Sequence, residues 1–306
     1  MRIVVMGTPQ IAAACLERLV ADGCDIVAVY TKPDTPKNRG MKLQPSEVKV
    51  AALAHGIPVC QPVNFKDEAT VAELAALKPD LIAVVAYGRI LPVSVLNIPP
   101  KGCINIHASL LPHLRGAGPI QWSILNGDDK TGVTAMYMAA GMDTGDMIAS
   151  IQTPIGDTDT GVTLTERLAV LGAELLSRVV RGAEVGTLSR TPQNEDEATY
   201  APMLSRELCP IDWEKDFFAI SCQVRGLIPW PVATAQLGGT RFKIFGVEPA
   251  ENPDGKAPGT LLALDKRGLV VACAGGAVRV TELQADGGKR MRAPDYFRGH
   301  PIALEA

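Results

Sequence analysis

The stretch RIVVMGTPQIAAACLERLVADGCDIVAVYT, residues 2–31, sets the fold class of this chain. The apolar run over residues 2–6 predicts a short buried strand. Residues 10–23 carry apolar side chains at helical spacing, and residues 25–31 have the composition of a second strand. A strand, a helix and a strand in this order predict two parallel strands joined by a crossover helix.

The same alternation continues outward from this unit. Further helices are expected at 46–55, 67–80, 117–127 and 163–182, and further strands at 57–62, 81–88, 103–107 and 132–139. This pattern predicts an α/β fold with a Rossmann-like, doubly wound and mostly parallel sheet. The first turn, MGTPQIA, lacks the G-x-G-x-x-G spacing that binds dinucleotides.

The character of the sequence changes near residue 190, which suggests a second domain. Residues 190–206 are polar and contain prolines, as is typical of a linker. Residues 207–306 consist mainly of short β-rich pieces with Gly-rich turns, which predict a small β-barrel. The first domain is therefore expected to span residues 1–189.

Composition places the chain among globular proteins. Of its 306 residues 47% are hydrophobic and 21% are charged, and the net charge is −3. No global field therefore favours nucleic acid, and an RNA partner would have to use local basic patches. The seven cysteines are scattered and odd in number, which argues against a disulfide framework or a zinc site, and no metal is expected. We expect a cytoplasmic protein, because no stretch resembles a signal peptide or a membrane span.

Two polar residues interrupt the apolar strand in CINIHASLLP, residues 103–112. Asn105 and His107 are two positions apart, so their side chains should project from the same face of the strand. Burying such groups without partners costs free energy. In the alternative interpretation, the histidine has a purely structural role and the asparagine caps a turn.

A carboxylate is expected to join this pair. The strand at 132–139 should reach the same sheet edge after a helical crossover, and GMDTGD follows it with Asp143. An asparagine amide and a protonated histidine can stabilise an oxyanion, and an aspartate favours the imidazolium. Since no reactive cysteine or G-x-S-x-G elbow lies nearby, the trio suits acyl transfer between bound substrates. Asp143 could alternatively serve only to build a turn.

Several motifs resemble those of the folate-dependent formyltransferases: MGTP, VVAYGRILP, GCINIHASLLPHLRGAGPIQWSILNGD and GMDTGDM. The likeness continues through ATYAP, IDW, PWP, DGGKRM and FRGHP, and so covers nearly the whole chain. The KNRGMKL loop and the GGKRM tail are similar to the branch of the family that acts on tRNA. This resemblance implies an OB-like form for the C-terminal barrel.

The resemblance implies a reaction and the residues for it. The formyl donor would be 10-formyltetrahydrofolate, and the acceptor would be the α-amino group of methionyl initiator tRNA. Asn105 and His107 would contact the formyl oxygen, while Asp143 would orient His107 and help to move protons. The residues implied to hold the folate are Tyr87, Gly88, Arg89, Ile90, Leu91, Ser109, Leu110, Leu111 and Pro112.

Basic residues are the expected tRNA contacts, and they fall in two places. The candidates are Lys37, Arg39 and Lys42 in the loop at 32–46, and Arg206, Lys289, Arg290 and Arg292 in the C-terminal domain. Some positions depart from the family pattern: His113-Leu114 replaces a common Arg-Trp, and Trp122 stands where a basic residue is common. These departures bear on how the tRNA is recognised.

Other functions remain open at this point. A formyltransferase acting on an amino-sugar nucleotide or on glycinamide ribonucleotide would share the same three residues. A hydrolase of formylfolate would use water as the acceptor of the formyl group. A non-catalytic RNA-binding protein would bind RNA but no longer catalyse the reaction. We expect a monomer, because nothing in the sequence demands a dimer.

Overall fold

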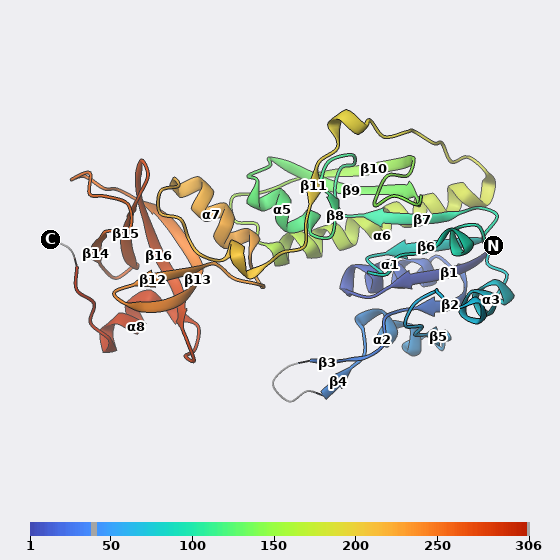
Figure 1. Ribbon diagram of the computed structural model, residues 1–306, viewed down its shortest axis with the longest axis horizontal. Coiled ribbons are helices and arrows are strands. Elements are labelled where there is room, and N and C mark those ends of the chain that lie inside the picture. The colour runs from blue at the N-terminus through green and yellow to red at the C-terminus, as the bar shows by residue number, and fades with distance from the viewer. Residues whose placement is uncertain (38–41, 305–306) are drawn as a thin grey trace. The chain divides into compact units, whose positions relative to one another are not determined.

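The computed structural model describes residues 1–37 and 42–304 (Figure 1). The chain divides into two compact units that interleave along the sequence. The first unit comprises residues 1–119, 131–153 and 165–201, and the second comprises 120–130, 154–164 and 202 onward. Within the described residues, no helix is long and apolar enough to cross a membrane. All seven cysteines are free thiols.

A seven-stranded sheet forms the centre of the first unit. Its order is β10 (Met147–Pro154), β9 (Lys130–Tyr137), β7 (Cys103–His107), β6 (Leu81–Val85), β1 (Arg2–Gly7), β2 (Asp25–Tyr30) and β5 (Val59–Cys60). The strands from β7 to β5 pair in parallel, as expected of a doubly wound sheet. The predicted α/β class with a mostly parallel sheet is confirmed.

The direction of β9 differs from the prediction. This strand pairs antiparallel with β7, so that Thr134 lies opposite His107 and Tyr137 lies opposite Ile104. The prediction of a helical crossover between β7 and β9 is wrong. The intervening helix α5 (Pro119–Leu125) is only seven residues long, and residues 120–130 belong to the second unit. The chain therefore does not return across the sheet between β7 and β9.

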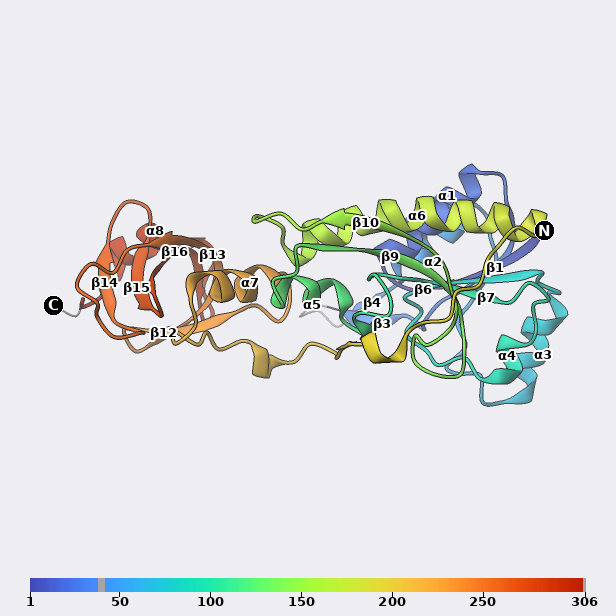
Figure 2. The same ribbon diagram turned by 90° about the horizontal axis from the view of Figure 1, so that it is seen from above.

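Helices cover both faces of the sheet. Helices α1 (Gln10–Ala21) and α6 (Gly161–Val185) lie on one side, whereas α3 (Glu68–Ala76) and α4 (Val93–Leu96) lie on the other (Figure 2). A further helix, α2 (Glu47–Ala54), packs against α1. Ser46 and Asp67 cap α2 and α3 by accepting backbone N–H groups, which explains where these helices begin. Helix α4 and strand β10 were not predicted.

A short hairpin interrupts the alternation after β2. Strands β3 (Thr35–Lys37) and β4 (Lys42–Gln44) pair antiparallel. Polar contacts hold the base of this hairpin in place. Nζ of Lys49 lies 2.7 Å from the Asp34 carboxylate and donates to Gln61 at 2.8 Å. Gln61 also donates to Asp34 at 2.8 Å.

The second unit contains a curled antiparallel sheet, a half-barrel, in agreement with the small β-barrel domain expected (Figure 1). Its order is β12 (Thr234–Leu237), β13 (Thr240–Ala250), β16 (Gly276–Ala285), β15 (Leu269–Cys273) and β14 (Leu261–Leu264), with β17 (Met291–Arg292) also paired to β16. Helices α7 (Phe217–Gly226) and α8 (Ala293–Gly299) contribute Ile220 and Phe297 to the core of this unit.

Candidate active site

Strand β7 presents different residues to the two faces of the sheet. Ile106 faces α6, since a Cβ built on Gly172 of that helix would lie 3.3 Å from its side chain. Cys103 belongs to the buried cluster on the opposite face, with Leu74 of α3 and Val95 of α4. By alternation, Asn105 and His107 project on the same face as Cys103. The predicted pairing of the amide and the imidazole on one face is therefore confirmed.

Asp143 reaches His107 by a different route from the one predicted. The end of β9 lies beside the beginning of β7, since the N–H of Met138 donates to the Cys103 carbonyl at 2.8 Å. The following loop brings an oxygen of Asp143 to 3.6 Å from Nδ1 of His107. The same oxygen accepts the backbone N–H of Gly116 at 2.8 Å.

This loop after β9 is sharply folded. Asp143 has φ +53°, in the left-handed region where a non-glycine residue is strained. A Cβ on Gly145 would lie 1.7 Å from the Tyr137 carbonyl oxygen, so that only glycine fits this approach. The glycine two positions after Asp143 is thus required by the backbone that carries the carboxylate.

A backbone carbonyl fixes the orientation of the His107 ring. Nε2 of His107 lies 2.9 Å from the Leu114 carbonyl, and this carbonyl can only accept, so Nε2 carries the hydrogen. Nδ1 is then the ring atom that faces Asp143. Leu114 is buried and has φ +59°, and its backbone N–H donates to the Thr199 hydroxyl at 2.9 Å.

Asn105 differs from His107 and Asp143 in having an available side chain. It is partly exposed, and its amide makes no hydrogen bond within residues 1–37 and 42–304. An unpaired donor beside a fixed histidine and carboxylate suits a substrate carbonyl oxygen. The geometry therefore provides one free donor and one oriented ring for acyl chemistry.

The first segment expected to hold folate, Tyr87 to Leu91, follows β6. The Tyr87 ring is buried, its centroid lies 6.4 Å from that of Phe65, and burial raises the pKa of Tyr87 to about 12. Its hydroxyl has no hydrogen-bond partner within the described part of the chain. Leu91 is buried, whereas Ile90 is 92% exposed and is not a core residue. Gly88 and Arg89 are exposed.

The second segment, Ser109 to Pro112, follows β7 directly. Thr134 holds it in place: the Thr134 hydroxyl donates to the Ser109 carbonyl at 2.7 Å and accepts from the Leu111 N–H at 3.1 Å. Leu111 and Pro112 are buried, and Leu110 is partly exposed. The segment is thus held by Thr134 of β9 directly after the end of β7.

The basic residues expected to bind tRNA have varied surroundings. Arg290 donates twice to Glu282, at 2.7 and 2.6 Å, and its guanidinium lies 4.4 Å from the centre of the Phe245 ring. Arg292 donates to the Lys266 carbonyl at 3.0 Å. Arg206, in the turn η2 (Arg206–Leu208), and Lys289 are exposed. The predicted contact Arg39 lies outside the described residues, and Lys37 and Lys42 are described only as ends of the hairpin strands.

Sequence reasoning missed a group of residues around the active-site loops. Strand β8 (Arg115–Gly116) pairs in parallel with β11 (Tyr200–Ala201), across the part of the chain expected to be a linker. Arg115 is fully buried and donates to Gln193 and Glu195, the latter in the short helix η1 (Glu195–Glu197). No local sequence pattern indicates this group, because the burial of Arg115 is seen only in the folded chain.

The structure also describes the surroundings of the positions that depart from the family pattern, His113, Leu114 and Trp122. His113 is exposed, and Leu114 acts through its backbone carbonyl, so that its side chain is not the group that orients His107. Trp122 donates its indole N–H to the Pro202 carbonyl at 2.8 Å, both in the second unit.

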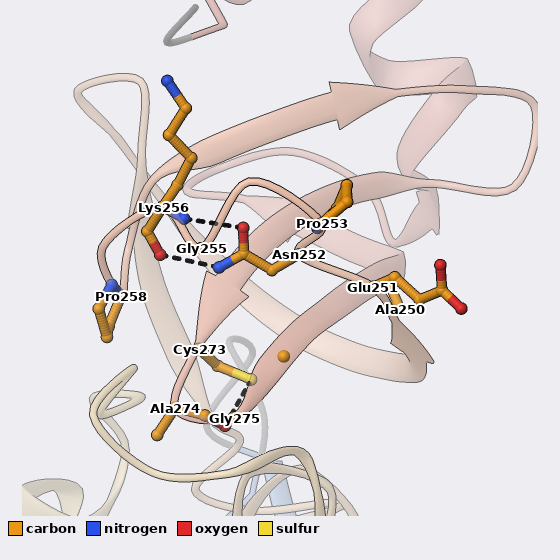
Figure 3. A pocket seen from close by; sticks show the side chains of 11 residues that line it. Ala250, Glu251, Asn252, Pro253, Gly255, Lys256, Pro258, Cys273, Ala274 and Gly275 are labelled. Carbon is orange, nitrogen blue, oxygen red and sulfur yellow. Dashed lines mark hydrogen bonds between the residues drawn. The ribbon is translucent and has the colours of Figure 1, made fainter.

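A cavity of about 560 Å³ opens in the second unit between the loop at 250–258 and the turn at 273–276 (Figure 3). Asn252 is engaged with the backbone of Lys256 through two hydrogen bonds of 2.8 and 2.9 Å. The ends of the Lys256 and Glu251 side chains point in different directions (Figure 3). The cavity therefore lacks a converging set of polar groups, and it contains none of the three predicted catalytic residues.

Comparison with known families agrees with this geometry. Residues 1–180 match the formyl transferase family, and residues 203–301 match the formyl transferase C-terminal domain. These matches show that the chain is a formyl transferase.

Curated relatives narrow the class. The methionyl-tRNA formyltransferase of Trichlorobacter lovleyi is 45% identical over 303 residues, covering 99% of this chain and 95% of that protein. The enzyme of the same name from Bacillus subtilis is 46% identical over 299 residues, covering 97% and 94%. That of Thiobacillus denitrificans is 49% identical over 306 residues, covering 99% and 98%. The chain belongs to the family of methionyl-tRNA formyltransferases.

Solved structures share the fold at lower identity. An N-formyltransferase from Helicobacter canadensis, in complex with folinic acid and dTDP-3-aminofucose, has a TM-score of 0.69 at 20% identity, covering 91% of this chain and 98% of that chain. HypX from Aquifex aeolicus, in complex with tetrahydrofolic acid, has a TM-score of 0.65 at 20% identity, covering 100% of this chain and 48% of that chain.

Proposed function

We propose that this protein transfers the formyl group of 10-formyltetrahydrofolate to the α-amino group of methionyl initiator tRNA. The observation that carries the chemistry is the free amide of Asn105 on the same strand face as His107, beside Asp143. The identity of 45 to 49% with methionyl-tRNA formyltransferases supports tRNA as the acceptor.

Each of the three side chains has a distinct task in this proposal. The methionine amine forms a bond to the formyl carbon, and the formyl oxygen becomes negatively charged. Asn105 donates a hydrogen bond to that oxygen, and a protonated Nδ1 of His107 adds positive charge nearby. The attacking nitrogen must lose a proton, and the departing folate nitrogen must gain one. Nδ1 of His107 and the Asp143 carboxylate, 3.6 Å apart, are the groups placed to carry it.

The residues near the two strand ends fit the flat pterin ring of folate, which needs stacking contacts as well as hydrogen bonds at its edge. Tyr87, Leu91 and Leu111 provide buried apolar surface, and the Tyr87 hydroxyl has no partner among the described residues. Ile90 is exposed and available to pack against a ligand. We assign the folate to Tyr87–Leu91 and Ser109–Pro112, where it supplies the formyl carbon to the catalytic trio.

The tRNA is assigned to the basic hairpin loop and to the basic residues of the C-terminal part. Lys37, Arg39 and Lys42 would meet the acceptor end, while Arg206, Lys289, Arg290 and Arg292 would meet backbone phosphates. Residues 1–189, 190–206 and 207–306 would form the catalytic domain, the linker and the tRNA-binding domain. The enzyme would act as a monomer in the cytoplasm.

Transfer to an amino-sugar nucleotide receives less support. The solved N-formyltransferase from Helicobacter canadensis, in complex with dTDP-3-aminofucose, shares only 20% identity with this chain, which shows the common fold alone. A non-catalytic RNA-binding role would not require Asp143 to be held in a strained backbone conformation beside His107.

The test is formyl transfer from radiolabelled 10-formyltetrahydrofolate to purified methionyl-tRNA, with initiator and elongator species compared. Labelling of the initiator species is expected. Asn105→Ala should lower kcat by about 10²–10³-fold, because one oxyanion donor is removed. Asn97→Ala, at an exposed position, is the matched control. Folate binding without label on either tRNA would move the acceptor elsewhere, and unchanged kcat in folded Asn105→Ala would remove the residue from the mechanism.

A further inference from the structure

We infer that the segment 193–201 positions the catalytic pair, with Gln193 and Thr199 acting as positioning residues for Asp143 and His107. This inference rests on the proposed function, since it assigns a task within the same reaction. The segment lies outside both family-matched ranges, which end at residue 180 and begin again at residue 203. All the contacts that carry the inference lie within the first unit.

Gln193 holds the loop that carries the catalytic carboxylate. Its side-chain Nε2 donates to the Asp143 carbonyl at 2.7 Å and to the Gly145 carbonyl at 2.8 Å. Asp143 has a strained backbone, so external hydrogen bonds are needed to keep it in this conformation. The two donations fix the peptide groups that follow Asp143 and Gly145, and hence the direction of the Asp143 side chain.

Thr199 holds the other partner of His107. Its hydroxyl accepts the Leu114 N–H at 2.9 Å, and its carbonyl accepts the Arg115 N–H at 2.8 Å. The carbonyl of Leu114 is the group that accepts from Nε2 of His107. The same segment therefore supports both groups that face the two ring nitrogens of this histidine.

Arg115 anchors the segment to the core. Its guanidinium is fully buried, and Nε and one terminal nitrogen donate to Oε1 of Gln193 at 3.0 and 2.8 Å. Glu195 accepts two further hydrogen bonds from Arg115 at 2.8 Å each. Since Oε1 of Gln193 is fully engaged by Arg115, its Nε2 must face the Asp143 loop. The orientation of the amide is thus determined on both sides.

The test separates the donor atoms of Gln193 from its packing. Gln193→Glu keeps an oxygen for Arg115 but replaces the Nε2 donor by a second oxygen facing two carbonyls. We expect kcat for formyl transfer to fall by about 10- to 100-fold, with both KM values within about twofold of wild type, because the catalytic groups are displaced rather than removed. Gln152→Ala, at an exposed position on β10, is the control and should behave as wild type.

A double-variant comparison distinguishes positioning of Asp143 by Gln193 from a purely structural role of Gln193. If Gln193 acts through Asp143, then Gln193→Glu should lower kcat by less than about twofold in an Asp143→Ala background. Full additivity, or unchanged kcat in Gln193→Glu of an active wild type, would overturn the inference. A wild type that transfers no formyl group would instead refute the proposed function. In that case the inference would be tested by the NMR signal of the His107 ring, one of four histidines in the chain. This signal should change in Gln193→Glu but not in Gln152→Ala. An unchanged signal in Gln193→Glu would overturn the inference.

Discussion

Two arginines make the same kind of contact in the two units of this protein, yet only one is available to a ligand. Arg115 and Arg290 each donate two hydrogen bonds to a glutamate, and these contacts raise the pKa of both guanidinium groups above the ordinary value. The side chain of Arg115 is 0% exposed, whereas that of Arg290 is 50% exposed.

The difference shows how the same chemistry serves either architecture or recognition. Arg115 uses its remaining donors on Gln193, so none of its contacts can be exchanged without disturbing the active-site loops. Arg290 is bound to Glu282 at the surface and rests on the Phe245 ring, so a phosphate can compete with the carboxylate. Exposure, rather than charge, separates the arginine proposed to position the active-site loops from the arginine proposed to bind tRNA.

The largest effect is expected on the buried side of this comparison. Arg115→Met should lower kcat by about 10²-fold, because Gln193 and Glu195 lose their anchor and the Asp143 loop relaxes. The melting temperature should also fall by a few degrees, since several charge-assisted hydrogen bonds are lost. Steady-state kinetics and calorimetry are the measurements. Arg178→Met removes an exposed arginine of α6 that is paired with Glu174 and should leave kcat unchanged; equal losses in the two variants would contradict the comparison.

A smaller effect is expected on the exposed side. Arg290→Ala should raise the KM for tRNA by about 3- to 10-fold and leave the KM for folate unchanged, because a phosphate contact is lost. The control is Arg298→Ala, which removes an exposed arginine paired with Asp295. A change in the folate KM would show that Arg290 does not act as a tRNA contact.

Removing the Glu282 carboxylate, which competes with phosphate for Arg290, should increase the difference between the two arginines. Glu282→Gln frees Arg290 from its ion pair and should lower the KM for tRNA by about twofold. This gain should shrink as salt is added, because exposed charges are screened. Measuring the KM at two salt concentrations tests both statements, and a raised KM at low salt would show that Glu282 organises Arg290 for binding.

The smallest effect concerns pH. The hydrogen bonds from Arg115 hold the pKa of Glu195 below its ordinary value of 4.5. A carboxyl whose folded pKa is lowered contributes stability above its unfolded pKa and loses it as pH falls through the folded pKa. The difference in melting temperature between wild type and Glu195→Gln should therefore be present at pH 7 and narrow below pH 4.5. In an Arg115→Met background the difference should be absent at every pH.

Much of the fold and the site follows from local sequence. The alternation of apolar strands and amphipathic helices is enough to predict the sheet, and the two-residue spacing places Asn105 and His107 on one face. The direction of β9 is not predictable this way, because apolar alternation is the same for parallel and antiparallel strands. Asp143 was correctly placed beside His107, although the loop after an antiparallel strand brings it there.

The positioning residues could not be found from sequence patterns. Gln193 lies 78 positions from Arg115 in the chain, and its surroundings have the polar, proline-containing composition of a linker. Nothing local distinguishes an amide that contacts solvent from one that holds two carbonyls. The pairing of β8 with β11 is a tertiary event, and only the folded chain shows it.

The late position of segment 193–201 has a consequence for how the enzyme is made. All three proposed catalytic residues are synthesised before it, as are the sheet that carries them and the helix α6. A nascent chain ending at residue 189 would hold Asn105, His107 and Asp143 but neither Gln193 nor Thr199. The supports of Asp143 and His107 would therefore be complete only after about a dozen further residues, when the sheet has already been made.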